Sequence, residues 1–244
     1  MLFFCSNKFT HSCIGIAIGI PQSVILVGNA VIHIPKAPFI GLTFAVEKMS
    51  RKGMKKVIII GATGSLAQYV IEALKNLDNV ALSLFVRNKN RLPKSTAEGC
   101  HIIEGDAINY KDVKNAVAGQ DIVYVNLAGD LEAMAKNIVK AMNETGVKRI
   151  IAISSIGIYI TPLKSVLVQY RKLADVVESS GLEYTILRPD WFTNANEINY
   201  AITQKGQPEK GTAISRKSIA AFIATIIEKP ELYKNENLGI SKPN

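Results

Sequence analysis

A chain of 244 residues, 48% of them hydrophobic, has enough apolar side chains for one sizeable core, and its length favours one domain over two. The formal net charge of +9 comes without a clustered basic stripe or interleaved aromatic residues, so nucleic acid is not an expected partner. Three cysteines, of which Cys5 and Cys13 lie near the amino terminus, cannot build a disulfide framework, so we expect a protein of the reducing cytoplasm.

Residues 1–53 differ in pattern from the rest of the chain. Lys8 and the apolar run CIGIAIGI resemble the start of a signal peptide, but polar residues between Pro21 and His33 leave the apolar pieces too short to cross a bilayer. The run MKKVIIIGATG from Met54 is how a domain begins when its first strand opens the protein. We therefore expect translation to start at Met54. Two alternatives stay open for residues 1–53: an anchor to a membrane or a partner, and a genuine part of the fold.

From residue 55 onward, short apolar runs alternate with stretches of helical spacing. Such alternation predicts a doubly wound α/β domain over residues 54–244, with a parallel sheet of about seven strands covered on both faces. The predicted strands are 56–60, 81–86, 101–106, 121–127, 149–155, 184–189 and 238–241. The predicted helical stripes are 66–74, 131–142, 167–177 and 219–227. The polar, Gly-rich segment 203–215 is expected in a small cap on the substrate side.

The sequence GATGSLA joins the first predicted strand directly to the first helix. Gly61 permits a sharp turn, and we expect Gly64 to leave room for a phosphate beside the backbone. The small side chain of Ala67 lets the helix pack closely on the strand, and Thr63 and Ser65 add hydroxyl donors. Because the first turn of a helix carries unpaired N–H groups, the pattern predicts a site for the diphosphate of a dinucleotide.

The second predicted strand is followed by basic residues. Arg87 stands directly after it, with Lys89 and Arg91 beyond, and the next acidic residue is Glu98. NAD sites usually place an Asp or Glu here for the ribose 2′-hydroxyl, whereas an Arg suits the 2′-phosphate of NADP. We therefore expect NADP(H) to be preferred over NAD(H), with a solvated basic turn as the alternative.

Several motifs together resemble one family. VIIIGATGSLAQYVIEAL, EGDAIN, NLAG, RIIAISSIGIY and SSGLEYTILRPDWF are similar to the atypical short-chain dehydrogenase/reductases of the NmrA-like group, over residues 55–244. The resemblance implies a Rossmann fold that binds NADP. It implies cofactor contacts at Gly61, Thr63, Gly64, Ser65, Leu66, Arg87, Asp106, Ala107, Leu127, Ala128, Gly129 and Ser154, with Arg188 and Pro189 near the nicotinamide.

The chain departs from the family at the catalytic pair. Standard members follow a Ser with Tyr-x-x-x-Lys on the next helix, where residues four apart share a face. Ser155 occupies the first position, but Tyr170 is followed four residues later by Ala174, and Lys172 is only two residues away. Ser155 and Tyr170 are therefore the catalytic candidates, with a packing role for Tyr170 as the alternative. Tyr159 and Trp191, on turns after strands, are expected to line the substrate pocket.

These observations predict an NADP(H)-dependent reductase that transfers hydride to a small quinone-, flavin- or carbonyl-type acceptor. Without the Tyr/Lys pair, an acceptor that takes its proton from water or with help from Ser155 is easier to reduce than a plain ketone. A non-enzymatic NADP(H)-sensing regulatory protein of NmrA type is the alternative. A membrane-attached protein follows only if residues 1–53 are genuine. Either a monomer or a homodimer is expected, and His11, His33 and His101 predict no metal site.

Overall fold

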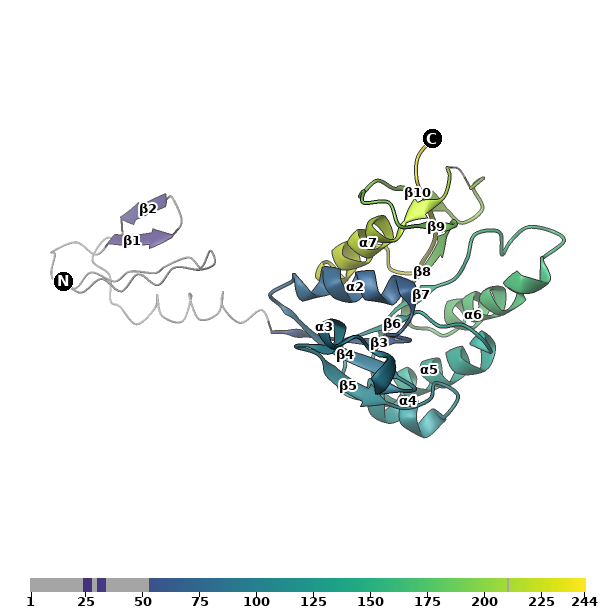
Figure 1. Ribbon diagram of the computed structural model, residues 1–244, viewed down its shortest axis with the longest axis horizontal. Helices are drawn as coiled ribbons and strands as arrows, with labels where there is room; N and C mark the ends of the chain where they lie inside the picture. The colour runs from purple at the N-terminus through teal and green to yellow at the C-terminus, as the bar shows by residue number, and fades with distance from the viewer. Residues whose placement is uncertain (1–23, 28–29, 34–52, 210) are drawn as a thin grey trace. The chain divides into compact units, whose positions relative to one another are not determined.

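The computed structural model describes residues 24–27, 30–33, 53–209 and 211–244 (Figure 1). The chain divides into two units, Met1–Lys52 and Gly53–Asn244. In the first unit, β1 (Val24–Val27) and β2 (Ala30–His33) form an antiparallel pair. The signal-like run after Lys8 lies outside the described residues, so the expectations for residues 1–53 stay predictions.

The second unit is built on one eight-stranded sheet with the order β10-β12-β8-β7-β6-β3-β4-β5. All of these strands run parallel except β10, which pairs antiparallel with β12. Their bounds are β3 (Lys55–Ile60), β4 (Val80–Val86), β5 (His101–Glu104), β6 (Ile122–Val125), β7 (Arg149–Ile153), β8 (Glu183–Pro189), β10 (Ala201–Gln204) and β12 (Glu236–Ser241).

Each predicted strand is present in this sheet, and β10 is an additional strand of it. The sequence placed Thr203 and Gln204 in a loop, whereas the structure puts them in this edge strand. Its side chains are half-buried or exposed, so it lacks the apolar run that marks a strand buried on both faces. The chain fills one half of the sheet with β3, β4 and β5 and then crosses back to β6. The strand order therefore reverses between β3 and β6, where open α/β sheets bind ligands.

Helices cover both faces of this sheet (Figure 1). On one face lie α2 (Ser65–Lys75) and α7 (Arg216–Glu228), and on the other α4 (Tyr110–Val117), α5 (Leu131–Thr145) and α6 (Val168–Glu178). Two short turns of helix, α3 (Lys94–Ala97) and η1 (Lys89–Arg91), follow β4. The sequence predicted the four longer helices but neither α3 nor α4, whose apolar stripes are short.

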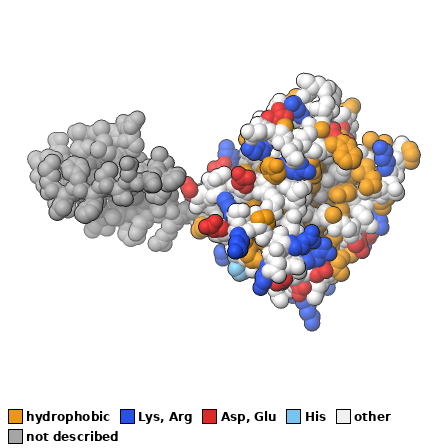
Figure 2. All heavy atoms as spheres, in the orientation of Figure 1, with side chains coloured by type: hydrophobic (Ala, Val, Ile, Leu, Met, Phe, Trp, Pro, Cys, Tyr) orange, Lys and Arg blue, Asp and Glu red, His pale blue; other side chains and the backbone are white. Residues whose placement is uncertain are grey.

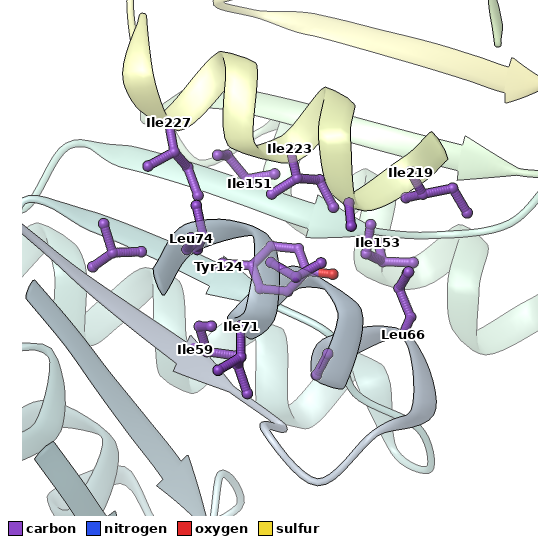
Figure 3. Packing of buried hydrophobic residues seen from close by; sticks show 14 of the residues in the cluster. Ile59, Leu66, Ile71, Leu74, Tyr124, Ile151, Ile153, Ile219, Ile223 and Ile227 are labelled. Atoms are coloured by element: carbon purple, nitrogen blue, oxygen red, sulfur yellow. The ribbon is translucent and has the colours of Figure 1, made fainter. Parts of the chain in front are cut away.

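Two apolar cores result, one on each face of the sheet. In β3, Ile59 packs into the core under α2 and α7, which Figure 3 shows, and Ile58 packs into the core on the other face. Both side chains are fully buried. Alternate residues thus enter opposite cores, which is why the central strands read as continuous apolar runs.

The segment between β8 and α7 adds β10 to the main sheet and also contains a separate two-stranded pair. In this pair β9 (Phe192–Thr193) runs parallel to β11 (Ile214–Ser215), and Ile214 N donates to the carbonyl oxygen of Trp191 at 2.8 Å. On the face that Figure 2 shows, Lys and Arg side chains lie interspersed with Asp and Glu side chains. No helix within the described residues is long and apolar enough to span a membrane.

Candidate functional site

The turn between β3 and α2 is held tightly against the end of β6. Gly61 has a φ of +91°, in the left-handed region that favours glycine. A Cβ atom built on Gly61 would overlap the carbonyl oxygen of Asn126, and one built on Gly64 would lie 2.7 Å from Asn126 Nδ2. The structure thus gives a reason for both glycines in the protein itself. A larger residue at 61 would push the turn away from the backbone after β6, and one at 64 would displace the side chain of Asn126.

The amino terminus of α2 is open to an anion. Its N-cap, Gly64, provides no side-chain hydrogen bond, and the first turn holds no acidic residue. The backbone N–H groups at this end have no partner one turn back in the helix and carry its positive dipole. Ala67 is fully buried against the sheet, so the helix packs close to β3. Leu66 is also fully buried and can offer only its backbone to a ligand.

The residues predicted to contact the cofactor after β4 and β5 differ in burial and in the hydrogen bonds that they make. Arg87 is exposed and makes no hydrogen bond or ion pair with the part of the chain that the structure describes. Asp106 Oδ1 accepts from Ile108 N at 3.0 Å, so this carboxylate caps its own turn. The side chain of Ala107 is buried at 3% exposure. Of these three, Arg87 is the residue whose side chain has no hydrogen-bond partner among the described residues and is exposed.

A cavity of about 650 Å³ opens at the carboxyl ends of β6, β7 and β8. That volume is typical of sites for small organic ligands. The cavity and the glycine turn share Asn126 and Leu127, since a Cβ on Gly61 would also lie 3.1 Å from Leu127 Cδ2. Its lining includes Asn126, Leu127, Ser154, Ser155, Ile156, Gly157, Ile160, Lys164, Val166, Tyr170, Pro189, Asp190, Trp191 and Phe192. Of the predicted residues, Leu127, Ser154, Ser155, Tyr170, Pro189 and Trp191 meet here.

The two serine hydroxyl groups in this cavity are held by backbone carbonyls. Ser154 Oγ donates to the carbonyl oxygen of Tyr170 at 3.0 Å, and Ser155 Oγ donates to that of Ile156 at 3.2 Å. Lys172 Nζ lies 2.6 Å from Glu132 Oε2 on α5, so this lysine is committed to an ion pair outside the cavity lining. Lys172 is therefore not placed to assist Tyr170 in the way of the family's pair.

Tyr159, expected in the substrate pocket, is not among the residues that line the cavity. Its hydroxyl accepts a hydrogen bond from Asn237 Nδ2 at 2.7 Å, and Arg171 and Lys205 lie over its ring at 4.7 and 4.8 Å from the centroid. Burial, followed by the nearby Glu178 carboxylate, raises the pKa of Tyr159. This tyrosine belongs to a polar cluster behind the cavity wall.

Arg188, expected near the nicotinamide, lies in the same cluster and is 2% exposed. Its Nε donates to Glu209 Oε1 at 2.9 Å, and its Nη1 donates to Asn237 Oδ1 at 2.6 Å. Glu209 Oε2 in turn accepts from Gly157 N at 3.1 Å. Because Gly157 lines the cavity, Arg188 supports the cavity wall through Glu209 and does not itself line the cavity.

Sequence reasoning missed Asn126, Lys164 and Glu209. Asn126 could have been found as the first polar residue after a buried strand at the point where the strand order reverses. Lys164 and Glu209 lie in irregular segments without periodicity, and Glu209 meets Gly157 across 52 positions of the chain. Within the described residues, no group of three or more His, Cys, Asp or Glu side chains is placed to hold a metal ion.

Comparison with known proteins identifies the class to which this arrangement belongs. Residues 61–230 match the model of a family described as NAD(P)H-binding. A Rossmann-fold NAD(P)-binding family protein from Shigella flexneri is 44% identical, with a TM-score of 0.73 over 78% of this chain and 95% of that one. The chain belongs to this NAD(P)-binding Rossmann-fold family, and the resemblance to the atypical short-chain dehydrogenase/reductases is confirmed at this level.

Two further relatives bear on the chemistry. A short-chain dehydrogenase/reductase from Veillonella parvula, solved in complex with NADP, is 27% identical, with a TM-score of 0.70 over 78% of this chain and 95% of that one. Quinone oxidoreductase 2 of Escherichia coli is 26% identical over 162 residues, which cover 65% of this chain and 55% of that protein. The chain spans about half the length of the curated relatives that it matches.

Proposed function

We propose that this protein is an NADP(H)-dependent reductase that transfers hydride to a small quinone-, flavin- or carbonyl-type acceptor. The observation that carries the proposal is the cavity of about 650 Å³ that shares Asn126 and Leu127 with the glycine turn. A dinucleotide bound at the turn would present its nicotinamide end to this cavity, because both lie at the carboxyl edge of the sheet. The relationship to a quinone oxidoreductase supports the same class of reaction.

The residues at the turn fit a dinucleotide. The uncapped end of α2 and the absence of acidic residues in its first turn favour the diphosphate, and Thr63 and Ser65 can donate hydroxyl hydrogens. When bound, NADPH supplies the hydride, which is the chemistry the cofactor carries itself. The proposed cofactor contacts are Gly61, Thr63, Gly64, Ser65, Leu66, Arg87, Asp106, Ala107, Leu127, Ala128, Gly129, Ser154 and Pro189, with Arg188 acting from behind the wall.

The chain's own contribution to the reaction is to bind and orient the acceptor in a cavity with mostly apolar walls. Ser155 and Tyr170 are the hydroxyl groups available to hold the acceptor oxygen or pass it a proton. Lys172, the lysine nearest to Tyr170 in the sequence, is paired with Glu132 and does not take the part of the family's catalytic lysine. Acceptors whose reduced form gains its proton readily from water, such as quinones and flavins, are therefore favoured over ketones.

The preference for NADP(H) over NAD(H) rests on Arg87. This side chain is exposed at the end of β4 and engages no other described residue, so its guanidinium is free to pair with a 2′-phosphate. Glu104, the acidic residue of β5, is bonded to Lys89 and not to Arg87.

The second candidate is a non-enzymatic NADP(H) sensor, favoured by the missing Tyr/Lys pair. NADPH oxidation measured against quinones, flavins and aldehydes separates the two. Turnover with a quinone or flavin supports the reductase. Absence of turnover with every acceptor, together with tight NADPH binding by calorimetry, contradicts the reductase and supports the sensor.

A further inference from the structure

The cavity contains one lysine that the proposed reaction does not use. Lys164 lies between the end of β7 and α6, on the wall that also carries Ile160 and Val166. Its side chain makes no hydrogen bond or ion pair with the described residues. Its ammonium group is therefore available to a ligand that enters the cavity.

The few charged side chains in the cavity lining indicate which group of a ligand Lys164 can bind. Lys164 is the only Lys or Arg, and Asp190 the only Asp or Glu, among the described residues that line it. Asp190 Oδ1 already accepts from Trp191 N at 2.6 Å, and the two side chains form no ion pair. The carboxylate thus has a partner within the protein, whereas the ammonium has none among the described residues.

The mouth of the cavity is apolar. Ile160, Val166 and Trp191 line it, and their side chains are 63%, 71% and 82% exposed. Large apolar side chains exposed in this way around a cavity mark a surface that is covered when a ligand binds. A flat aromatic body against these side chains would leave a charged substituent within reach of the exposed Lys164.

We propose that the acceptor of this enzyme is a planar aromatic molecule that carries an anionic group, and that Lys164 binds that group. The inference rests on the proposed reductase function and deepens it by naming the class of acceptor. Lys164 acts as a specificity residue for the acceptor and takes no part in proton transfer.

The test compares riboflavin with FMN, which share the redox-active ring and differ in a terminal phosphate. Steady-state NADPH oxidation is measured with the full chain and with Lys164→Met, which keeps the length of the side chain but removes the charge. We expect the substitution to raise KM for FMN about fivefold, to leave KM for riboflavin within about twofold, and to leave kcat unchanged for both. 1,4-Naphthoquinone and its 2-sulfonate provide a second pair.

Two further variants control the comparison. Lys164→Arg keeps the charge and should restore most of the FMN affinity. Lys148→Met removes an exposed lysine at the amino end of β7, on the opposite edge of the sheet from the cavity, and should change neither KM. An equal change of KM for the neutral and the anionic acceptor in Lys164→Met, or a rise confined to the KM of NADPH, overturns the inference while the reductase function stands.

If none of the four acceptors is reduced, the reductase function fails for quinones and flavins. The contact between Lys164 and an anionic group is then tested by a binding measurement. Calorimetry then measures FMN binding to the protein saturated with NADP. Binding that weakens about fivefold in Lys164→Met but not in Lys148→Met supports the anion contact. Absence of FMN binding, or equal affinity in the two variants, overturns it.

Discussion

At the scale of single residues, Asn126 determines which side chains the glycine turn can tolerate. It follows β6 directly, and both Gly61 and Gly64 lie against it. Gly61 is constrained twice, by its positive φ and by this contact, whereas Gly119 has a φ of +74° but no atom within 4 Å of the position that a Cβ would take. Comparison of Gly61 with Gly119 therefore separates the cost of backbone strain from the cost of steric overlap.

We predict that Gly61→Ala lowers the free energy of unfolding by about 3 kcal/mol and Gly119→Ala by about 1 kcal/mol, since only the first adds a clash with backbone to the strain of a positive φ. Urea titration followed by circular dichroism measures both. Equal losses in the two variants would mean that Asn126 does not restrict the turn.

Arg87 is the residue on which the proposed preference for NADP(H) depends. Arg87→Asp should weaken NADP binding about tenfold or more and improve NAD binding, because a carboxylate repels the 2′-phosphate and can accept from the 2′-hydroxyl. Calorimetry with both nucleotides measures the change. Arg91→Asp on η1 alters the net charge equally and serves as the control. If both variants weaken NADP binding to the same extent, the preference comes from the general field of the basic turn and not from Arg87.

Ser155 and Tyr170 differ in what their loss should do. With a quinone acceptor, Tyr170→Phe should lower kcat less than about tenfold, well below the loss of roughly 10²–10⁴ that removal of a general acid causes. Ser155→Ala should have an effect of similar size. A drop in kcat of more than about 10³ in either variant, with normal unfolding, would assign that hydroxyl an essential proton transfer.

At the scale of elements, the segment between β10 and β11 is fastened to the cavity wall by Glu209. This carboxylate receives Arg188 from β8 and the N–H of Gly157 from the turn after β7. The three lie far apart in the sequence, and their contact explains why Gly157 is held in place although it belongs to an irregular segment.

Removal of this carboxylate leaves a buried guanidinium with only Asn237 as a hydrogen-bond partner among the described residues. Glu209→Ala should therefore lower the free energy of unfolding by about 3 kcal/mol and raise KM for the acceptor, because the wall beside Ser155 loses its support. Glu231→Ala, at an exposed residue that is absent from every ion pair among the described residues, is the matched control. Stability that falls no further in Glu209→Ala than in this control would show that the contact is not structural.

Comparison of the strands with their sequences shows which of them could be predicted. The central strands were predictable because residues such as Ile58 and Ile59 are buried on both faces of the sheet and produce unbroken apolar runs. The edge strand β10 was not, since its pairing with β12 depends on backbone contacts far along the chain. Tyr159 was expected at the ligand because it follows a strand, and Arg188 because the family resemblance implies it. Nothing local in the sequence indicates that Asn237 and Glu209 engage them.

At the scale of the whole molecule, the Gly53–Asn244 unit contains the complete eight-stranded sheet, both apolar cores and the cavity. We predict that a chain beginning at Met54 unfolds at the same temperature as the full chain and binds NADPH with the same affinity. Differential scanning calorimetry and nucleotide titration measure these properties. A loss of stability in the shorter chain would make residues 1–53 part of the fold.

The turn between β3 and α2, as the site of a dinucleotide diphosphate, is the feature on which the proposed function depends most. Isothermal titration calorimetry of the purified protein with NADPH and NADH tests this directly. We predict micromolar affinity for NADPH and at least about tenfold weaker binding of NADH, because Arg87 is proposed to pair with the 2′-phosphate. The absence of measurable binding of either nucleotide to the folded protein would contradict the site, and with it the proposed reductase.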